Sequence, residues 1–201
     1  MFITLEGIDG SGKTLQAEKL KGSLESRGKN VLWTREPGGW PGGNAVRSML
    51  LGGNISHLMT ETLLFFADRC EHMSQIVQPA LDDGHFVVCE RYNDSTLAYQ
   101  CWGRGIDRAR IERLIEWCSL PKPDITFWFD IPVFEALRRR TGRDAPDRIE
   151  SEKLSFHEKV AAGFKALAEE EPQRIIRIDA SQSPELVAKA VIDALEERGI
   201  L

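Results

Sequence analysis

The sequence predicts an α/β fold in which a five-stranded, mostly parallel sheet is flanked by helices on both faces. One observation is that short apolar runs alternate with helical patterns along the whole chain, which is typical of parallel sheets. A second is that these runs, such as 86–89, are continuously apolar, as strands covered on both faces are. A third is a glycine-rich loop at 7–14, between the first strand and the first helix.

The first strand and helix flank this loop. Residues 2–5 are apolar and rich in β-formers, which predicts a buried strand. After the loop, Ala17, Leu20 and Leu24 recur at helical spacing, and Gly28 stands where a helix would end. A strand, a glycine loop and a helix in this order are the context that a phosphate-binding loop requires.

The remaining strands are short apolar runs bounded by charged residues or turn formers. They are expected at 31–34, 86–89, 125–130 and 174–178. Helical spacing of apolar residues occurs at 46–50, 60–83, 94–102, 107–118, 131–140, 160–168 and 186–194. No internal repeat or low-complexity tract interrupts this order, so residues 1–201 are expected to form a single domain.

The charge balance and the cysteines limit the possible functions. Lys and Arg total 26 against 31 Asp and Glu, so we expect no nucleic-acid partner, because proteins that bind polyanions broadly are usually basic. The four cysteines contain no C-x-x-C pair, which favours free thiols in a reducing compartment over a zinc site. The chain opens directly on its first strand and has no apolar run of membrane-spanning length. We therefore expect a cytoplasmic protein without a membrane partner.

The glycine-rich loop matches G-x-x-x-x-G-K-[ST], a pattern of loops that bind nucleotide phosphates. Its backbone N–H groups can surround phosphate oxygens, and the following helix adds partial positive charge. Lys13 is placed to bridge the β- and γ-phosphates, and the Thr14 hydroxyl is placed to ligate Mg²⁺. The predicted nucleotide-binding residues are Gly7, Ile8, Asp9, Gly10, Ser11, Gly12, Lys13 and Thr14.

Polar residues also follow other predicted strands. Ligands of parallel sheets bind beyond the carboxyl ends of the strands, so segments 35–37 and 90–92 and Asp130 should converge with the loop on one cleft. Glu90 could organise magnesium there, or it is an ordinary acid at a strand end. The candidate phosphate ligands are Arg35, Arg47 and Arg91.

Aromatic and polar side chains near the same strand ends are candidates for holding a base. They are Phe65, Phe66, Arg69, Thr96, Tyr99 and Gln100. A phenylalanine on a helix is more often a core residue than a stacking platform, and composition leaves both readings open for Phe65 and Phe66.

Arginines are concentrated late in the chain. They are Arg138, Arg139, Arg140, Arg143 and Arg148. By itself such a run is usually a solvated helix face. Beside a phosphate loop, the glycine, proline and mixed charges within the run predict a short mobile lid over about 138–149. Its arginines would enter the site on closure, exclude water and stabilise the transferred charge.

Several motifs occur in a specific order and spacing. They are residues 5–14, 34–39, 64–69, 91–100, 103–105, 121–124 and 147–150. Together they resemble the bacterial-type thymidylate kinases, which are nucleoside-monophosphate kinases with the P-loop NTPase fold. The resemblance implies ATP-dependent phosphorylation of dTMP to dTDP by direct in-line transfer, with Mg²⁺, in a homodimer that supports dTTP synthesis.

By position in these motifs, the resemblance implies contacts to the thymine base. Phe65 matches the ring that stacks on thymine, and it stands four residues before Arg69, which matches the contact to the base O4. Thr96 and Gln100 match the positions that touch the edge of the base.

The resemblance also implies contacts to the sugar and phosphate of dTMP. Tyr99 matches the residue against the 2′ side of the sugar, where its ring would disfavour a ribose hydroxyl. Asp9 matches the acid on the 3′-hydroxyl, and Arg91 matches the arginine on the acceptor phosphate. The full predicted substrate-binding set is Asp9, Arg35, Pro37, Phe65, Arg69, Arg91, Thr96, Tyr99 and Gln100.

The resemblance also implies which residues supply positive charge for catalysis. In this family, lid arginines and an arginine of the phosphate loop substitute for each other, and positions 8–11 contain no arginine here. The predicted catalytic residues are Lys13, Arg91, Arg140 and Arg143, and the predicted metal residues are Thr14 and Glu90. The family commonly has Asp at the position of Glu90. Because the longer arm moves the carboxylate, we expect Glu90 to contact magnesium through water.

Other functions compete with this one. The nearest is a kinase of the same fold that acts on another nucleoside monophosphate or on a deoxynucleoside, and segments 65–69 and 96–100 argue against it. A nucleotide-dependent switch is disfavoured because N-K-x-D is absent and no D-x-x-G follows the loop. A nucleic-acid-binding module built on the arginine run would show salt-sensitive binding to DNA.

Overall fold

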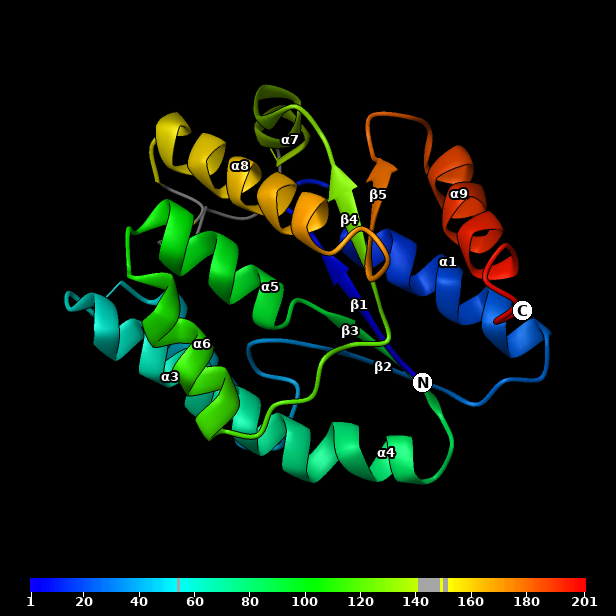
Figure 1. Ribbon diagram of the computed structural model, residues 1–201, viewed down its shortest axis with the longest axis horizontal. Coiled ribbons are helices and arrows are strands. Elements are labelled where there is room, and N and C mark those ends of the chain that lie inside the picture. Colours follow the sequence, from blue (N-terminus) through cyan, green and yellow to red (C-terminus); the bar gives the residue numbers. More distant parts are fainter. Residues whose placement is uncertain (54, 141–148, 150–151) are drawn as a thin grey trace.

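Figure 1 shows the computed structural model, in which a central sheet separates two layers of helices. The structure describes residues 1–53, 55–140, 149 and 152–201, and of Arg140 only the backbone. The strands are β1 (Phe2–Glu6), β2 (Val31–Arg35), β3 (Phe86–Glu90), β4 (Ile125–Asp130) and β5 (Ile175–Asp179). They pair in the order β2-β3-β1-β4-β5, and each of these pairings is parallel. The predicted α/β fold is therefore confirmed, with a sheet that is parallel throughout the described strands.

Helices fill the connections between the strands. They are α1 (Lys13–Ser26), α2 (Gly43–Leu51), α3 (Leu58–His72), α4 (Gln78–Asp82), α5 (Asn93–Thr96), α6 (Arg108–Trp117), α7 (Val133–Arg140), α8 (Leu154–Glu170) and α9 (Pro184–Glu196), with π-helical segments η1 (Met73–Val77) and η2 (Leu97–Gly103). The predicted helical stretch 60–83 corresponds to α3, η1 and α4, which follow one another without a break, and 94–102 corresponds to α5 and η2. The π-helical geometry was not expected, because the spacing of apolar residues signals a helix but not its exact winding.

The last strand begins one residue later than the predicted 174–178. The Arg174 amide donates to the Glu171 carbonyl in the preceding turn. At the other end, Asp179 extends the strand by pairing with Asp130 of β4. Apolar content marks the centre of a strand, whereas its ends are set by hydrogen bonds to the neighbouring strand.

Each face of the sheet has its own helices. On one face, α1 packs against β2 and β3, and α9 lies beside α1 and against β5 (Figure 1). On the other face, α8 packs along η2 and over β4 and β5. All five residues of the central strand β1 are buried, as its continuous apolarity predicts.

The carboxyl ends of β1, β2 and β3 lie at the same level of the sheet. Glu90, the last residue of β3, pairs with Leu5 of β1 and with Arg35 of β2. The segments that follow these three strands therefore meet at one edge of the sheet, as the sequence predicts.

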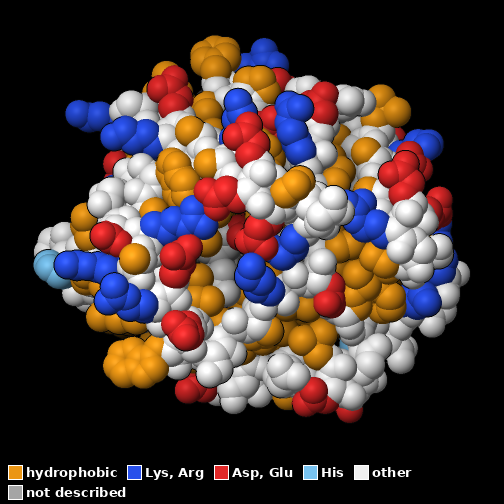
Figure 2. Space-filling model, in the orientation of Figure 1, with side chains coloured by type: hydrophobic (Ala, Val, Ile, Leu, Met, Phe, Trp, Pro, Cys, Tyr) orange, Lys and Arg blue, Asp and Glu red, His pale blue; other side chains and the backbone are white. Residues whose placement is uncertain are grey.

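The surface carries charges of both signs. On the face shown in Figure 2, positive and negative side chains are interspersed. Some of the exposed charges form ion pairs, as Arg108 does with Glu112 and Glu170. All four cysteines are free thiols, of which Cys89 is buried and the other three are partly buried. Within the described ranges, the helices are too short or too polar to cross a membrane.

Candidate active site

The phosphate loop joins β1 to α1 and lies against α7. Gly10 has φ 88°, and a Cβ atom there would lie 2.2 Å from the carbonyl oxygen of Ala136, so only glycine fits. Gly12 has φ 90° immediately before α1 begins at Lys13. The glycines therefore permit the close approach of α7 and the sharp entry into the helix.

Lys13 folds back into the loop. Its Nζ donates to the carbonyl oxygens of Gly7 at 3.0 Å and Ile8 at 2.9 Å. Burial, followed by repulsion from Arg91, lowers the pKa of Lys13 to about 8. A phosphate anion at the loop would stabilise the protonated form of Lys13, which burial disfavours.

Side-chain alternation at the ends of β2 and β3 divides the site into two sides. Glu90 bonds Thr14 of α1, so Glu90 and its neighbour in register, Arg35, face the α1 side. The Thr34 hydroxyl bonds His72 of α3, so this hydroxyl points to the α3 side, although Thr34 also borders the groove on the α1 side. Each side contains a depression, which we call the α1 groove and the α3 cavity.

The α1 groove holds the predicted metal residues. Its lining residues are Thr14, Trp33, Thr34, Arg35, Gly38, Gly39, Trp40, Pro41, Ile76 and Glu90. The Glu90 carboxylate accepts hydrogen bonds from Thr14 Oγ1 at 2.7 Å and from Trp33 Nε1 at 3.0 Å. Hydroxyl and carboxylate oxygens are ligands that suit Mg²⁺, and the structure brings Thr14 and Glu90 together at the start of α1. The residues present therefore fit the ion.

The α3 cavity gathers the predicted substrate-binding residues. Its volume is about 120 Å³. It is lined by Asp9, Glu36, Pro37, Arg47, Leu51, Phe65, Arg69, Arg91, Ser95, Thr96, Tyr99, Gln100 and Ile149. Of the predicted set, Arg35 lies elsewhere, at the α1 groove. Of the two phenylalanines, Phe65 lines the cavity, whereas Phe66 is buried in the core.

Asp9, Arg91 and Tyr99 connect the cavity to the phosphate loop. Arg91 donates to Asp9 Oδ1 at 2.6 Å and to the Gly7 carbonyl at 3.2 Å. The Tyr99 hydroxyl donates to Asp9 Oδ2 at 3.1 Å. Burial raises the pKa of Asp9, but the charges of Arg91 and Lys13 outweigh it and hold this pKa below its usual range. An ionised carboxylate of the loop therefore faces the cavity.

Arg69 is buried at the α3 cavity and fixed on several sides. Its Nε donates to Glu36 Oε2 at 2.6 Å, and its Nη1 donates to Thr96 Oγ1 at 2.9 Å. The other carboxylate oxygen of Glu36 lies 3.0 Å from Nδ1 of His72, whose Nε2 lies 2.6 Å from the Thr34 hydroxyl. This chain of contacts sets the orientation of the guanidinium.

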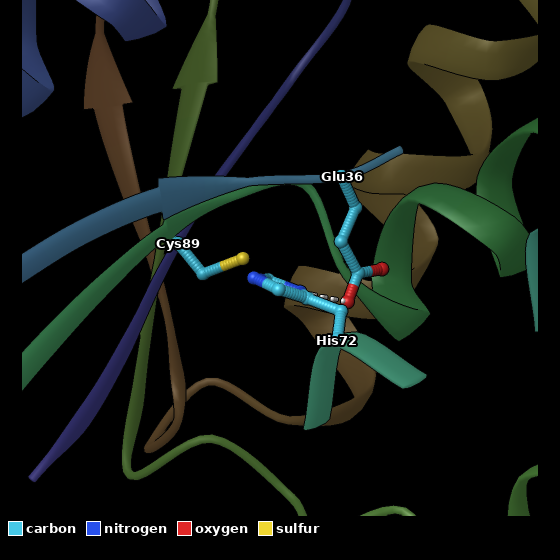
Figure 3. Close-up of side chains that lie close together, drawn as sticks. All are labelled: Glu36, His72 and Cys89. Atoms are coloured by element: carbon cyan, nitrogen blue, oxygen red, sulfur yellow. Dashed lines mark hydrogen bonds and ion pairs between the residues drawn. The ribbon is translucent and has the colours of Figure 1, made fainter. Parts of the chain in front are cut away.

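Figure 3 shows that the His72 ring lies between the carboxylate of Glu36 and the thiol of Cys89. Ligand atoms of these three residues lie within 4.8 Å of one another. Burial, followed by the charge of Glu36, raises the pKa of Cys89 well above its usual value, and Glu36 already pairs with Arg69. A metal ion would need the thiolate and would face the charge of Arg69. We therefore interpret the cluster as a group of buried side chains that holds the Arg69 guanidinium in its orientation.

Comparisons with known proteins identify the family. The family model for thymidylate kinases matches residues 5–191. This chain belongs to the thymidylate kinase family. It is 45% identical to a thymidylate kinase of Alkalilimnicola ehrlichii over 198 residues, which cover 96% of this chain and 91% of the relative. It is 46% identical to one of Synechococcus sp. over 199 residues, with 98% and 95% covered.

A solved structure agrees with this assignment. The crystal structure of thymidylate kinase from Ehrlichia chaffeensis matches with a TM-score of 0.81 at 36% identity, covering 98% of each chain. The predicted P-loop NTPase fold and the predicted membership of an enzyme family, the thymidylate kinases, are confirmed.

The lid expected for a thymidylate kinase, at about 138–149, lies mostly outside the described residues. Among those outside are Arg143 and the side chain of Arg140, so their catalytic roles stay predictions. The described Arg139 donates to the carbonyl oxygens of Ala180 at 2.8 Å and Ser181 at 3.3 Å. These bonds attach α7 to the loop after β5.

Glu6 is a site residue that the sequence did not single out. It accepts hydrogen bonds from the backbone N–H groups of Tyr92 at 2.7 Å and Ser95 at 3.3 Å, so it holds the turn that carries Arg91, whose φ is 66°. Burial, followed by the nearby charge of Asp94, raises the pKa of Glu6 to about 7. Its position directly before the phosphate loop was the available signal.

Proposed function

We propose that this protein transfers the γ-phosphoryl group of ATP to dTMP, giving dTDP, by direct in-line transfer. The observation that carries the proposal is that the phosphate loop and the α3 cavity share Asp9 and meet at Arg91. A donor bound by the loop and an acceptor bound in the cavity would face each other across this contact. Membership of the thymidylate kinase family supports dTMP as the acceptor.

The loop binds the phosphates of ATP. Its N–H groups and the N-terminus of α1 supply partial positive charge. Lys13 exchanges the carbonyl oxygens of Gly7 and Ile8 for phosphate oxygens. Thr14 and Glu90 would hold Mg²⁺, which would supply positive charge to the phosphates.

The α3 cavity binds the base of dTMP. Phe65 stacks on the thymine ring, and Arg69 donates to the base O4 from an orientation that Glu36 fixes. Thr96 and Gln100 contact the edge of the base. The buried Arg69–Glu36 pair thus provides a rigid hydrogen-bond donor that selects for an acceptor oxygen on the base.

The sugar and phosphate of dTMP lie toward the loop. Asp9 accepts a hydrogen bond from the 3′-hydroxyl, and the Tyr99 ring fills the space beside the 2′ carbon. Arg91 binds the acceptor phosphate, and Arg47, whose Nη1 donates to the Pro37 carbonyl at 2.9 Å, adds charge to the same cavity. Arg35 contributes positive charge from its position at the α1 groove.

Phosphoryl transfer needs positive charge around the transferred group, with little covalent work for the protein. Lys13 and Arg91 supply part of it. Lys13 lies in the loop that binds the donor, and Arg91 pairs with Asp9 at the cavity that binds the acceptor. Arg140 and Arg143 of the lid supply the rest, because the phosphate loop contains no arginine.

We also propose that the protein is a homodimer and is cytoplasmic. Large apolar side chains are exposed on α2 and α3 at Met49, Leu58 and Leu63, which suits burial against a second copy. The free cysteines fit a reducing compartment. Sedimentation equilibrium should give twice the monomer mass, and a monomer mass at all concentrations would contradict the dimer.

A panel of acceptors tests the function against its nearest alternative, a kinase of the same fold with another substrate. With ATP and Mg²⁺, kcat/KM should be highest for dTMP among dTMP, UMP, CMP, AMP and thymidine. A higher kcat/KM for any of the other four would contradict the proposal.

A further inference from the structure

We propose that Trp33 is a positioning residue that fixes the Glu90 carboxylate for magnesium. The inference rests on the proposed function, in which Glu90 and Thr14 hold the ion. Trp33 Nε1 donates to Glu90 Oε1 at 3.0 Å, and Thr14 Oγ1 donates to Glu90 Oε2 at 2.7 Å. Among the residues that the structure describes, each carboxylate oxygen therefore has one donor, and rotation of the carboxylate would break at least one of these bonds.

The register of the sheet explains why Trp33 reaches this acid. β2 and β3 are parallel, with Trp33 paired to Val88 and Arg35 paired to Glu90. Because side chains alternate along a strand, Trp33 and Glu90 project from the same face, offset by one side-chain repeat. The long indole and the long side chain of Glu90 together span the diagonal distance between these two positions on neighbouring strands. The shorter side chain of Asp would draw the carboxylate back from the indole.

The chemistry of the indole limits what Trp33 can do. Its N–H group donates but cannot accept a hydrogen bond or ligate a cation, so any effect of this group on a metal ion passes through the acid. A carboxylate oxygen with one donor keeps a lone pair for a water molecule or a metal ion. Loss of such a supporting partner typically changes metal affinity by about 10–100-fold.

Two matched substitutions test the inference without turnover. Trp33→Phe keeps an aromatic ring and removes the N–H group. Trp40→Phe makes the same change in the same groove, where the Trp40 indole donates to Asp68 at 2.9 Å and not to Glu90. The affinity for Mn²⁺, measured by electron paramagnetic resonance with a non-hydrolysable ATP analogue bound, should fall about tenfold in Trp33→Phe. It should stay at the wild-type value in Trp40→Phe.

A double-mutant cycle with Glu90→Asp separates positioning from a general effect on the fold. In the Glu90→Asp background, the Trp33→Phe change should lower the Mn²⁺ affinity by less than about twofold, because the shorter acid no longer contacts the indole. The KM for dTMP should stay unchanged in Trp33→Phe, since Trp33 does not line the α3 cavity.

Equal Mn²⁺ affinities in the wild type and in Trp33→Phe, with the variant folded by circular dichroism, would overturn the inference. An equal loss in Trp40→Phe, or an undiminished loss in the Glu90→Asp background, would also overturn it. If the affinities follow the expected pattern but the wild type does not phosphorylate dTMP, the proposed function fails and the role of Trp33 stands.

Discussion

Arg91 and Asp9 form an ion pair of 2.6 Å that ties the turn after β3 to the phosphate loop. The Tyr99 hydroxyl bonds the same carboxylate, and the Arg91 guanidinium lies 5.1 Å from the centre of the Tyr99 ring. These contacts fix the orientation of the guanidinium between loop and cavity. In the proposed mechanism, the acceptor phosphate would share this pre-oriented arginine with Asp9.

Replacing Arg91 with Ala should lower kcat/KM for dTMP by about 100-fold or more, because a charged donor to the reacting phosphate is lost. The affinity for an ATP analogue should change far less, because Lys13 and the loop bind the donor. Steady-state kinetics and calorimetric titration measure the two effects. Arg108→Ala removes an exposed arginine of α6 and should behave as the wild type. An unchanged kcat/KM in Arg91→Ala would refute its role at the acceptor phosphate.

Replacing Tyr99 with Ala should relax the preference for a deoxyribose. The Tyr99 ring is held edge-on by Phe156 and Phe164, so it cannot easily move aside for a 2′-hydroxyl. The ratio of kcat/KM for dTMP and its ribose counterpart should fall about tenfold in Tyr99→Ala. Tyr99→Phe keeps the ring and should keep the ratio. If the ratio is the same in all three proteins, Tyr99 does not exclude the ribose.

Glu6 should give the stability of the protein a specific pH dependence. Its pKa is raised from 4.5 to about 7 in the folded chain, so the folded state keeps a proton that the unfolded state releases. The stability that Glu6 contributes is therefore fully present below pH 4.5 and is lost as the pH rises to about 7. Between these limits, the free energy of unfolding of the wild type should fall by about 2 kcal/mol relative to Glu6→Gln.

Urea unfolding at several pH values measures this difference. Glu116→Gln, at an exposed position of α6, serves as the control for a general effect of replacing a glutamate. The decisive quantity is the free energy of unfolding of the wild type minus that of Glu6→Gln. If this quantity stays level or rises from pH 4.5 to pH 7, Glu6 is not protonated on folding.

The strands and the phosphate loop could be predicted because their signals are local. The apolar run at 125–130 and the pattern from Gly7 to Thr14 each lie within a few consecutive residues. The strand order β2-β3-β1-β4-β5 was not predicted. Which strand lies beside β1 depends on how helices pack across the sheet, and no residue within a strand records it.

Residues that support other side chains were harder to predict than those that line the cavity. Phe65 and Arg69 carried a family motif, whereas Trp33 acts on an acid 57 positions away and His72 acts through Glu36. Such partners share no spacing in the sequence. Their roles become visible only when the fold places the side chains together.

Arg35 and Glu36 are neighbours in the sequence but lie in different parts of the site. Arg35 adjoins Glu36 in the motif 34–39, and the sequence grouped it with the substrate-binding residues. Alternation at the end of β2 instead places Arg35 at the α1 groove, while Glu36 lines the α3 cavity. The motif identifies the segment but not the face on which each side chain lies.

Lys13 provides the most direct test that the phosphate loop acts on ATP while the α3 cavity holds dTMP. The measurement is the turnover of dTMP to dTDP by Lys13→Ala, followed by phosphorus NMR, beside the affinity for dTMP from calorimetry. We expect kcat to fall by about 100- to 1,000-fold, with the Kd for dTMP near the wild-type value and the fold intact by circular dichroism. Wild-type kcat in Lys13→Ala, or a loss of dTMP affinity as large as the loss of turnover, would contradict this division of the site.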